Sequence, residues 1–288
     1  MYGIYAPGTN SEHHCIYARL AGCLKHESFS TTLVRSRPIL GKKRPMRLDK
    51  IRIGTSGWSY DHWKDIVYPW DSPDRDRLEW FVKRFDTVEV NSSYYNWPRA
   101  STFEGWHSRV PDGFCMTMKA PRGLTHSGRL ANAESWVERI KDSMEKLGDK
   151  RGILLAQLPP YMGIDIPALD NFLKLFTPWQ KIAVEFRNTS WNTEEVFGLL
   201  ERYSAAYCVM SGARLPCLLK ATADFVYIRL HGPDRNHMYG GSYSDEDLHW
   251  WAERIEEWTC QGRDIFVYFN NDGHGNAVRN AENLRSFL

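Results

Sequence analysis

From Ile51 onward, short apolar segments alternate with longer segments in which apolar residues recur every three or four positions. The short segments are rich in β-branched and aromatic residues and end in polar or glycine residues, which is typical of strands buried on both faces of a parallel sheet. We expect eight strands, at residues 51–58, 87–95, 113–121, 152–160, 181–188, 205–212, 224–232 and 264–272.

The segments between these strands have the pattern of amphipathic helices. Apolar residues within 78–85 follow the i, i+3, i+4, i+7 spacing of a helix face. A capping box is expected to begin at Ser101, and helix N-caps are expected at Thr193 and Ser244. Pro216 interrupts the segment after the sixth strand, so we expect the sixth helix to be short.

Eight strands that alternate with helices over roughly 240 residues are typical of a single (β/α)8 TIM barrel. The total length of 288 residues suits one such domain. A doubly wound open sheet is the alternative. The chain has neither the Gly-x-Gly-x-x-Gly motif nor the P-loop motif that would support a nucleotide-binding version of that fold.

The first 45 residues differ from the rest, because they show no sustained periodicity. Residues 1–50 contain nine lysines or arginines and three acidic residues, while the whole chain has a formal net charge of only +2. We expect residues 1–45 to form a disordered basic arm and residues 46–288 to form the barrel domain. Met46 is a candidate for the true start of the protein, and a transit peptide is the alternative explanation of the arm.

Composition and targeting signals suggest a soluble cytoplasmic protein that does not bind membranes. No apolar segment approaches the roughly 20 residues that a membrane span requires, and the N-terminus lacks the apolar centre of a signal peptide. The six cysteines show no C-x-x-C spacing, which argues against a zinc site or a disulfide framework. The sequence does not indicate an oligomeric state.

Charged side chains stand inside several of the expected strands, near the ends where a TIM barrel carries its chemistry. Glu185 and Arg187 share one face of the fifth strand, and Arg229 and His231 share one face of the seventh, because side chains alternate with a period of two. The catalytic candidates are Glu89, Glu185, His126 and His231. The substrate-binding candidates are Ser56, Trp58, Asn91, Tyr95, Lys119, Gln157, Arg187, Trp191, Arg229, Asn270 and Asn271.

An ion-pair network is the structural alternative to an active site. Buried charges are unfavourable unless they are paired. Glu89 and Glu185 would then be neutralised by Arg187 and Arg229 in a network that fills the top of the barrel.

Seven motifs, taken together and in this order, closely resemble the YecE-like family, a TIM-barrel domain of unknown function. The resemblance implies a barrel from about Ile51 to the C-terminus and implies no particular reaction. The sixth strand of the family often ends near an acidic residue, where this chain has Ser211-Gly212, so a mechanism that needs a carboxylate there is not expected. The motifs are Gly54-Thr55-Ser56-Gly57-Trp58, Val88-Glu89-Val90-Asn91, Lys119-Ala120-Pro121 with Thr125-His126, Gln157-Leu158-Pro159-Pro160, Ala183-Val184-Glu185-Phe186-Arg187, Arg229-Leu230-His231-Gly232 and Tyr268-Phe269-Asn270-Asn271.

Three functions fit these observations. The first is an enzyme, a hydrolase or isomerase, acting on a small polar or anionic substrate such as a sugar, a sugar phosphate or a nucleotide fragment. Lys119, Arg187 and Arg229 would hold the anion, and His126 or His231 would transfer protons. No motif requires a cofactor, and a divalent metal held by the two glutamates and His231 is an open variant.

The second function is a non-catalytic protein that binds a ligand or a partner. The third is nucleic-acid binding through the basic arm, which the net acidic remainder of the chain disfavours.

Overall fold

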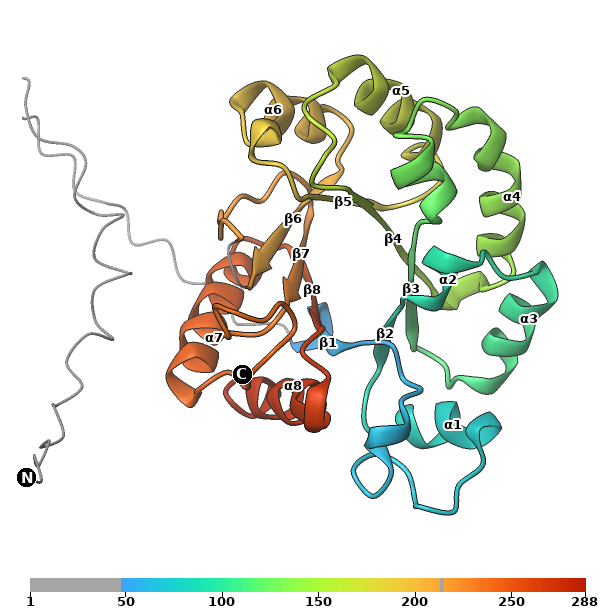
Figure 1. Ribbon diagram of the computed structural model, residues 1–288, viewed down its shortest axis with the longest axis vertical. Helices are drawn as coiled ribbons and strands as arrows, with labels where there is room; N and C mark the ends of the chain where they lie inside the picture. Colours follow the sequence, from blue (N-terminus) through green and yellow to red (C-terminus); the bar gives the residue numbers. More distant parts are fainter. Residues whose placement is uncertain (1–47, 213–214) are drawn as a thin grey trace, which may run out of the picture. The chain divides into compact units, whose positions relative to one another are not determined.

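The computed structural model describes residues 48–212 and 215–288, so the arm expected at residues 1–45 lies outside the described residues. Eight parallel strands follow one another around a closed barrel in sequence order, and the first strand pairs with the last (Figure 1). The predicted (β/α)8 TIM barrel is confirmed. The strands are Ile51–Ser56 (β1), Thr87–Val90 (β2), Cys115–Lys119 (β3), Arg151–Leu158 (β4), Ile182–Phe186 (β5), Ala206–Ser211 (β6), Phe225–Leu230 (β7) and Asp264–Phe269 (β8).

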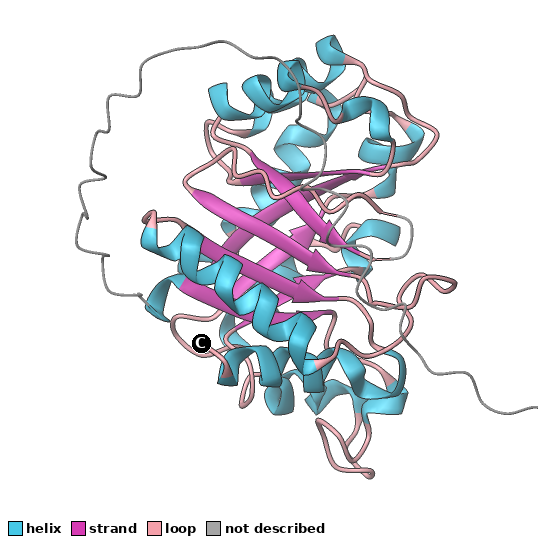
Figure 2. Cartoon of the chain, turned by 90° about the vertical axis from the view of Figure 1, so that its left-hand side faces the viewer, coloured by secondary structure: helices cyan, strands magenta, loops and turns pink. Residues whose placement is uncertain are grey.

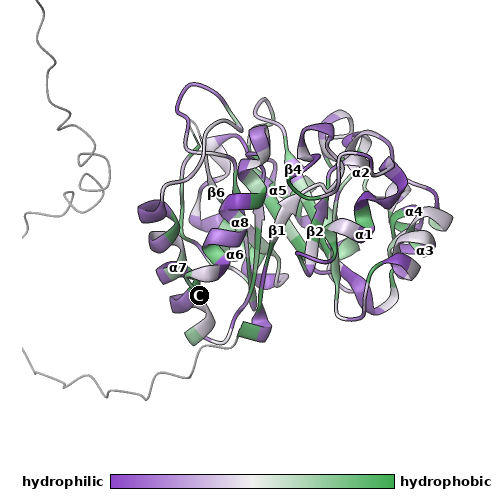
Figure 3. Ribbon diagram, turned by 90° about the horizontal axis from the view of Figure 1, so that it is seen from below, coloured by the Kyte–Doolittle hydropathy of each residue, from purple (hydrophilic) through white to green (hydrophobic). Residues whose placement is uncertain are grey.

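Helices surround the strands, and all strands point toward the same end of the barrel (Figure 2). The helices are Arg77–Phe81 (α1), Ser92–Tyr95 (α2), Ala100–Arg109 (α3), Glu134–Glu145 (α4), Ile166–Phe176 (α5), Glu194–Arg202 (α6), Asp245–Cys260 (α7) and Asn276–Ser286 (α8). Hydrophilic residues gather on their outward faces, and the strands beneath are mostly hydrophobic (Figure 3). No helix in the described part of the chain is long and apolar enough to cross a membrane.

Two of the three expected helix caps are confirmed. The Ser244 side chain accepts a hydrogen bond from the backbone of Asp247, whose own side chain accepts from the Ser244 backbone, so α7 begins with a capping box. The Thr193 side chain caps α6 by accepting a hydrogen bond from the backbone N–H of Val196. The capping box expected at Ser101 is wrong, because α3 begins one residue before it and has Arg99 as its N-cap, without a side-chain hydrogen bond.

Two other expectations differ from the structure. The second strand ends at Val90, where the Ser93 hydroxyl lies 2.7 Å from the carbonyl oxygens of both Val90 and Lys119 and the chain turns into the short helix α2. Between β6 and β7, the described residues 215–224 contain no helix, whereas a short one was expected. Pro216 lacks a backbone donor and disfavours helical geometry in the residue before it.

Alternate residues of each strand face either the helices or the barrel interior. Outward residues such as Leu154 and Ile228 belong to the large apolar core between strands and helices. Inward residues such as Leu155 and Tyr227 form a second, smaller cluster that fills the barrel. This alternation places the inward polar side chains beyond the apolar layers, at the C-terminal ends of the strands.

Gly54, an inward position of β1, sets how closely the first two strands approach. A Cβ atom added there would lie 2.3 Å from the backbone carbonyl oxygen of Thr87 on β2, which is far inside contact distance. Any side chain at this position would therefore force the two strands apart.

We predict that Gly54→Ala lowers the free energy of unfolding by about 1–3 kcal/mol, the usual effect of overpacking. Gly105→Ala is the matched control, because Gly105 lies in α3 with no atom within 4 Å of an added Cβ. It should raise the free energy of unfolding by about 0.5–1 kcal/mol through helix propensity. Urea denaturation of both variants measures this, and equal stability of the two would contradict the prediction.

Candidate functional site

Arg229 on β7 joins two glutamates that come from different strands of the barrel. Its Nη2 donates to Oε1 of Glu89 on β2 at 2.7 Å, and its Nη1 donates to Oε2 of Glu185 on β5 at 2.6 Å. All three side chains have no exposed surface. Glu89 also accepts from the Ser56 hydroxyl at 2.6 Å and from the Tyr227 hydroxyl at 2.5 Å.

The network continues from Glu185 toward the open end of the barrel. Arg187 donates from Nε to Glu185 Oε1, and its Nη2 lies 3.1 Å from Nε2 of the buried His231. Burial lowers the pKa of His231 to about 4, so the ring is neutral at pH 7. Its Nδ1 lies 3.2 Å from Nδ2 of Asn270, and its Nε2 lies 3.6 Å from Oε2 of Glu185. We call Glu89, Arg229, Glu185 and Arg187 the ion-pair network.

Both carboxyl groups of this network are ionised. Burial alone would raise the pKa of Glu89, but the charge of Arg229 and the hydroxyl hydrogen bonds outweigh it and lower that pKa. Burial likewise opposes ionisation of Glu185, but the charges of Arg187 and Arg229 hold its pKa well below the ordinary value. Their oxygens are already occupied, which favours a positioning role over proton donation.

Lys119 and His126 lie near the network at the C-terminal ends of the strands. The Lys119 ammonium is 4.6 Å from the centroid of the Tyr94 ring, and burial with the charge of Arg229 lowers its pKa to about 8. His126 Nδ1 is 3.0 Å from the Thr125 hydroxyl, and its ring lies 5.0 Å from that of Tyr94. Burial and the nearby Lys119 charge lower the pKa of His126 to about 4.

Four further expected residues lie at or near the same end of the barrel without joining the network. Gln157 is the register partner of Glu185 on the neighbouring strand β4. Asn91 directly follows β2, and its Oδ1 is buried without a hydrogen-bond partner among the described residues. Tyr95 is 74% exposed, and Trp58 packs edge-on against a tryptophan of α3.

Two expected binding residues are not brought to the network. Trp191 is fully buried, stacks on the outward-facing Phe186 and donates from its indole to the carbonyl oxygen of Met162 at 2.9 Å. Asn271 is also buried, and its amide donates to the carbonyl oxygen of Gly241 at 3.0 Å. In this structure the first packs the scaffold and the second holds the loop that follows β7.

Sequence reasoning missed Tyr227 and Cys208 as neighbours of the two glutamates. The Cys208 sulfur lies 3.7 Å from Glu185 Oε2, and Tyr227 is hydrogen-bonded to Glu89. The period-two signal was available, since Tyr227 precedes Arg229 by two residues on β7. A search for charged residues alone passes over both side chains.

The loop after β7 covers part of the network. The Tyr239 ring lies 5.4 Å from the His231 ring, and the Met238 sulfur lies 3.8 Å from Arg187 Nη1. Gly232, with φ of 96°, permits this fold-back, because an added Cβ would meet the Gly240 carbonyl oxygen at 2.2 Å. Met238 and Tyr239 remain more than one-third exposed, so the cover is partial.

Metal binding gains no support from the arrangement of ligand types. Within residues 48–212 and 215–288, no group of three or more His, Cys, Asp or Glu side chains is placed to hold a metal ion. The oxygens of Glu89 and Glu185 receive hydrogen bonds from arginines instead.

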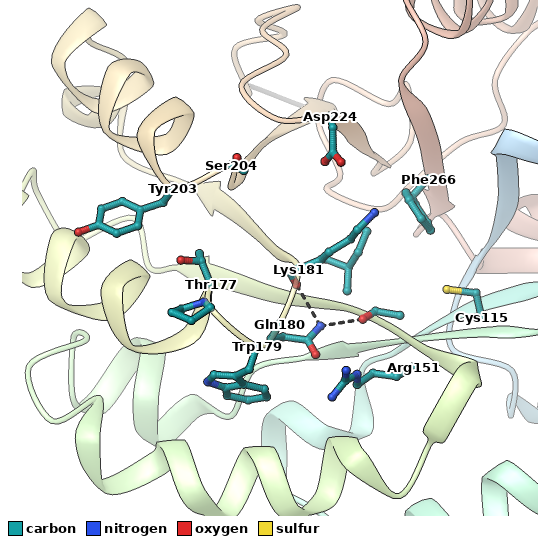
Figure 4. Close-up of a pocket in the computed structure, with 13 residues that line it drawn as sticks. Cys115, Arg151, Thr177, Trp179, Gln180, Lys181, Tyr203, Ser204, Asp224 and Phe266 are labelled. Carbon is teal, nitrogen blue, oxygen red and sulfur yellow. Dashed lines mark hydrogen bonds between the residues drawn. The ribbon is translucent and has the colours of Figure 1, made fainter.

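A cavity of about 520 Å³ lies at the opposite, N-terminal end of the strands (Figure 4). Its lining includes Arg151, Trp179, Lys181 and Asp224. Gln180 holds this region together, since its Nε2 donates to the carbonyl oxygens of Gly152 at 2.7 Å and of Lys181 at 3.0 Å, at the starts of β4 and β5. TIM-barrel chemistry occurs at the other end, so we assign this cavity to the scaffold.

The ion-pair network yields a stability prediction. Glu185→Gln leaves Arg187 and Arg229 short of a buried counter-charge and should lower the free energy of unfolding by about 3–5 kcal/mol. Glu194→Gln is the control, because Glu194 pairs with Lys220 on the surface and is 83% exposed, so its loss should change stability by under about 0.5 kcal/mol. Denaturant titration of both variants measures the difference. A loss below about 1 kcal/mol for Glu185→Gln would show that the pair is not structural.

The sequence of the chain is similar to those of known proteins. The chain is 27% identical over 274 residues to the UPF0759 protein YunF of Bacillus subtilis, covering 83% of this chain and 94% of YunF. It is also 27% identical over 139 residues to the UPF0759 protein YecE of Escherichia coli, which is 48% of each chain.

Solved structures agree with the fold. A DUF72 family protein from Thermotoga maritima superposes with a TM-score of 0.70 at 27% identity, covering 83% of this chain and 98% of that one. A DUF72 family protein from Enterococcus faecalis, at 20% identity and a TM-score of 0.69, covers 83% of this chain and 95% of that one and supports the fold alone. Residues 52–288 match the family described as "Protein of unknown function DUF72". The chain therefore belongs to the DUF72 family, which confirms the YecE-like resemblance.

Proposed function

We propose that the chain is an enzyme that acts on a small anionic substrate at the C-terminal ends of the barrel strands. The observation that carries the proposal is a charge imbalance. Arg187, Arg229 and Lys119 face only two carboxylates, Glu89 and Glu185, so one positive charge is left over. A substrate carboxylate or phosphate would supply the missing negative charge.

Arg187 and Lys119 are the groups that would receive this anion. Arg187 uses Nε for Glu185 and Nη2 for His231, while Nη1 has the weakly accepting sulfur of Met238 at 3.8 Å. The described residues place no carboxylate within 4.0 Å of Lys119 Nζ. Both cations therefore retain donors that an anionic oxygen could accept from.

His126 is the proposed proton acceptor. It is only half-buried and its ring is neutral, whereas His231 is fully buried and has neighbours at both ring nitrogens. The two glutamates act in this proposal by fixing Arg187 and Arg229. Either hydrolysis or isomerisation can use such a base, since both require a proton to be moved.

Measurements of turnover and of binding, on the wild type and on the variant Arg187→Met, test the proposal. A panel of sugar phosphates and 2-oxo acids is incubated with the protein and followed by proton NMR, and the same compounds are used in thermal-shift titrations. A ligand at one hundred times its Kd should stabilise the wild type by about 2.7 kcal/mol. Arg187→Met should abolish both turnover and stabilisation.

Arg52→Met is the matched control, because Arg52 lies near the start of β1 and pairs with Asp86 at 3.2 Å, at the opposite end of the barrel. It should behave like the wild type toward every compound. Stabilisation without turnover would instead support a non-catalytic binding protein. Failure of every anion to bind, or equal loss in both variants, would overturn the anion site.

The titration of His126 provides a second prediction. Burial and the charges of Lys119, Arg122 and Arg187 lower its pKa to about 4. A bound anion offsets those positive charges, so added inorganic phosphate should raise the pKa of His126. NMR titration of the imidazole signals, assigned with His126→Gln, measures the change. His249, exposed on α7, is the control whose signals should not respond to phosphate, and an unchanged His126 would contradict the proposal.

A further inference from the structure

We propose that Lys119 is a nucleophilic amine that forms a Schiff base with a ketone that also carries an anionic group. This inference deepens the function proposed above and rests on it. It assigns the substrate a reacting carbonyl carbon, in addition to the anion.

The position of Lys119 suits attack on a bound substrate. Lys119 is the last residue of β3 and faces the barrel interior like Thr117, two residues before it. The ends of barrel strands are where TIM-barrel enzymes place reacting groups. The ring of Tyr94 flanks the nitrogen at 4.6 Å, and Lys119 is only half-buried, so the amine is not sealed in the core.

Lys119 also differs from a structural lysine of the same chain. Lys150 is buried, and its ammonium donates to the carbonyl oxygens of His107 at 2.8 Å and Val110 at 2.7 Å. Among the described residues, the Lys119 nitrogen has neither such an acceptor nor a carboxylate within 4.0 Å. An unpaired ammonium that is half-buried lowers the stability of the fold. A role in stability therefore does not explain Lys119, whereas a functional role does.

The surroundings also make the amine available. Only a neutral amine attacks carbon, and neighbouring positive charge in a desolvated site favours the neutral form. Burial and the charge of Arg229 lower the pKa of Lys119 to about 8 from 10.5. At pH 8 about half of Lys119 is therefore neutral, roughly a hundredfold more than for an ordinary lysine.

The proposed step balances without an oxidant or reductant. The neutral amine of Lys119 adds to the carbonyl carbon, a carbon–nitrogen bond forms, and the carbonyl oxygen takes up a proton. The resulting carbinolamine is protonated and loses its oxygen as water, which leaves a cationic imine. Overall, one amine, one ketone and one proton give one iminium ion and one water. Arg187 would hold the anionic group, and His126 could accept the proton released from the attacking nitrogen.

Reductive trapping tests this step on the full-length protein at pH 8. The protein is mixed with pyruvate, which presents a carboxylate, or with dihydroxyacetone phosphate, which presents a phosphate, and is then treated with sodium borohydride. Hydride converts an imine into a stable secondary amine, which intact-mass measurement and peptide mapping detect. Acetone, a ketone without an anionic group, is the control compound.

We expect an adduct on Lys119 with at least one of the two anionic ketones. Lys150 should carry at least about tenfold less label, because two backbone carbonyls hold its nitrogen, and acetone should give at least about tenfold less, because it has no anionic group for Arg187 to hold. Whichever of the two ketones gives the adduct identifies the anionic group as a carboxylate or a phosphate. Lys119→Arg keeps the charge and should lose the adduct, while its circular dichroism spectrum reports that the barrel is intact. Mapping in the wild type is decisive even if that variant misfolds.

The absence of an adduct on Lys119 with both ketones overturns the Schiff-base proposal. Labelling of Lys119 no stronger than that of Lys150 overturns it as well. If anions still stabilise the wild type through Arg187 in that case, only this inference fails. If they do not, the anion site of the proposed function fails with it.

Discussion

The guanidinium of Arg229 is the interaction on which the rest of the site depends. Its planar fork matches two carboxylates from two other strands, and no solvent reaches any of the three groups. Such buried networks are seldom more stable than well-packed apolar residues would be. The network instead fixes the orientation of its side chains, because each carboxylate oxygen accepts from a particular donor.

The consequences run outward from that pair of contacts. With Glu185 bound to Arg229, Arg187 is held beside it, and the His231 ring lies between Arg187 and Asn270. Both acids are used up within the network, so the residues nearer solvent carry unbalanced positive charge. Burial lowers the pKa of both Lys119 and His126, and the positive charges nearby lower both further. The charge of Arg229 thus holds the two glutamates and also contributes to the lowered pKa of Lys119.

The fold was predictable from the sequence, and the site was predictable only in outline. Alternation with a period of two placed Glu185, Arg187 and Arg229 on inward faces, because strand geometry is local and regular. It could not say that Trp191 packs on the outer side of β5, since that depends on how the following loop returns. The prediction of a capping box at Ser101 was wrong for a related reason. The local sequence pattern did not show that the helix begins at Ala100, one residue earlier. Which side chains from different strands meet inside the barrel can be seen only in the closed structure.

The seam between β1 and β8 has a consequence for synthesis on the ribosome. Ile51 pairs with Ile265, so one edge of β1 has no partner until almost the whole chain has emerged. At ordinary elongation rates the delay is roughly 10–40 s. Throughout that time the nascent sheet presents an open edge of apolar strand, the kind of surface that pairs with other chains. Helix α8, which packs against β1, arrives last of all. The barrel therefore cannot close over that edge of β1 until β8 has been synthesised.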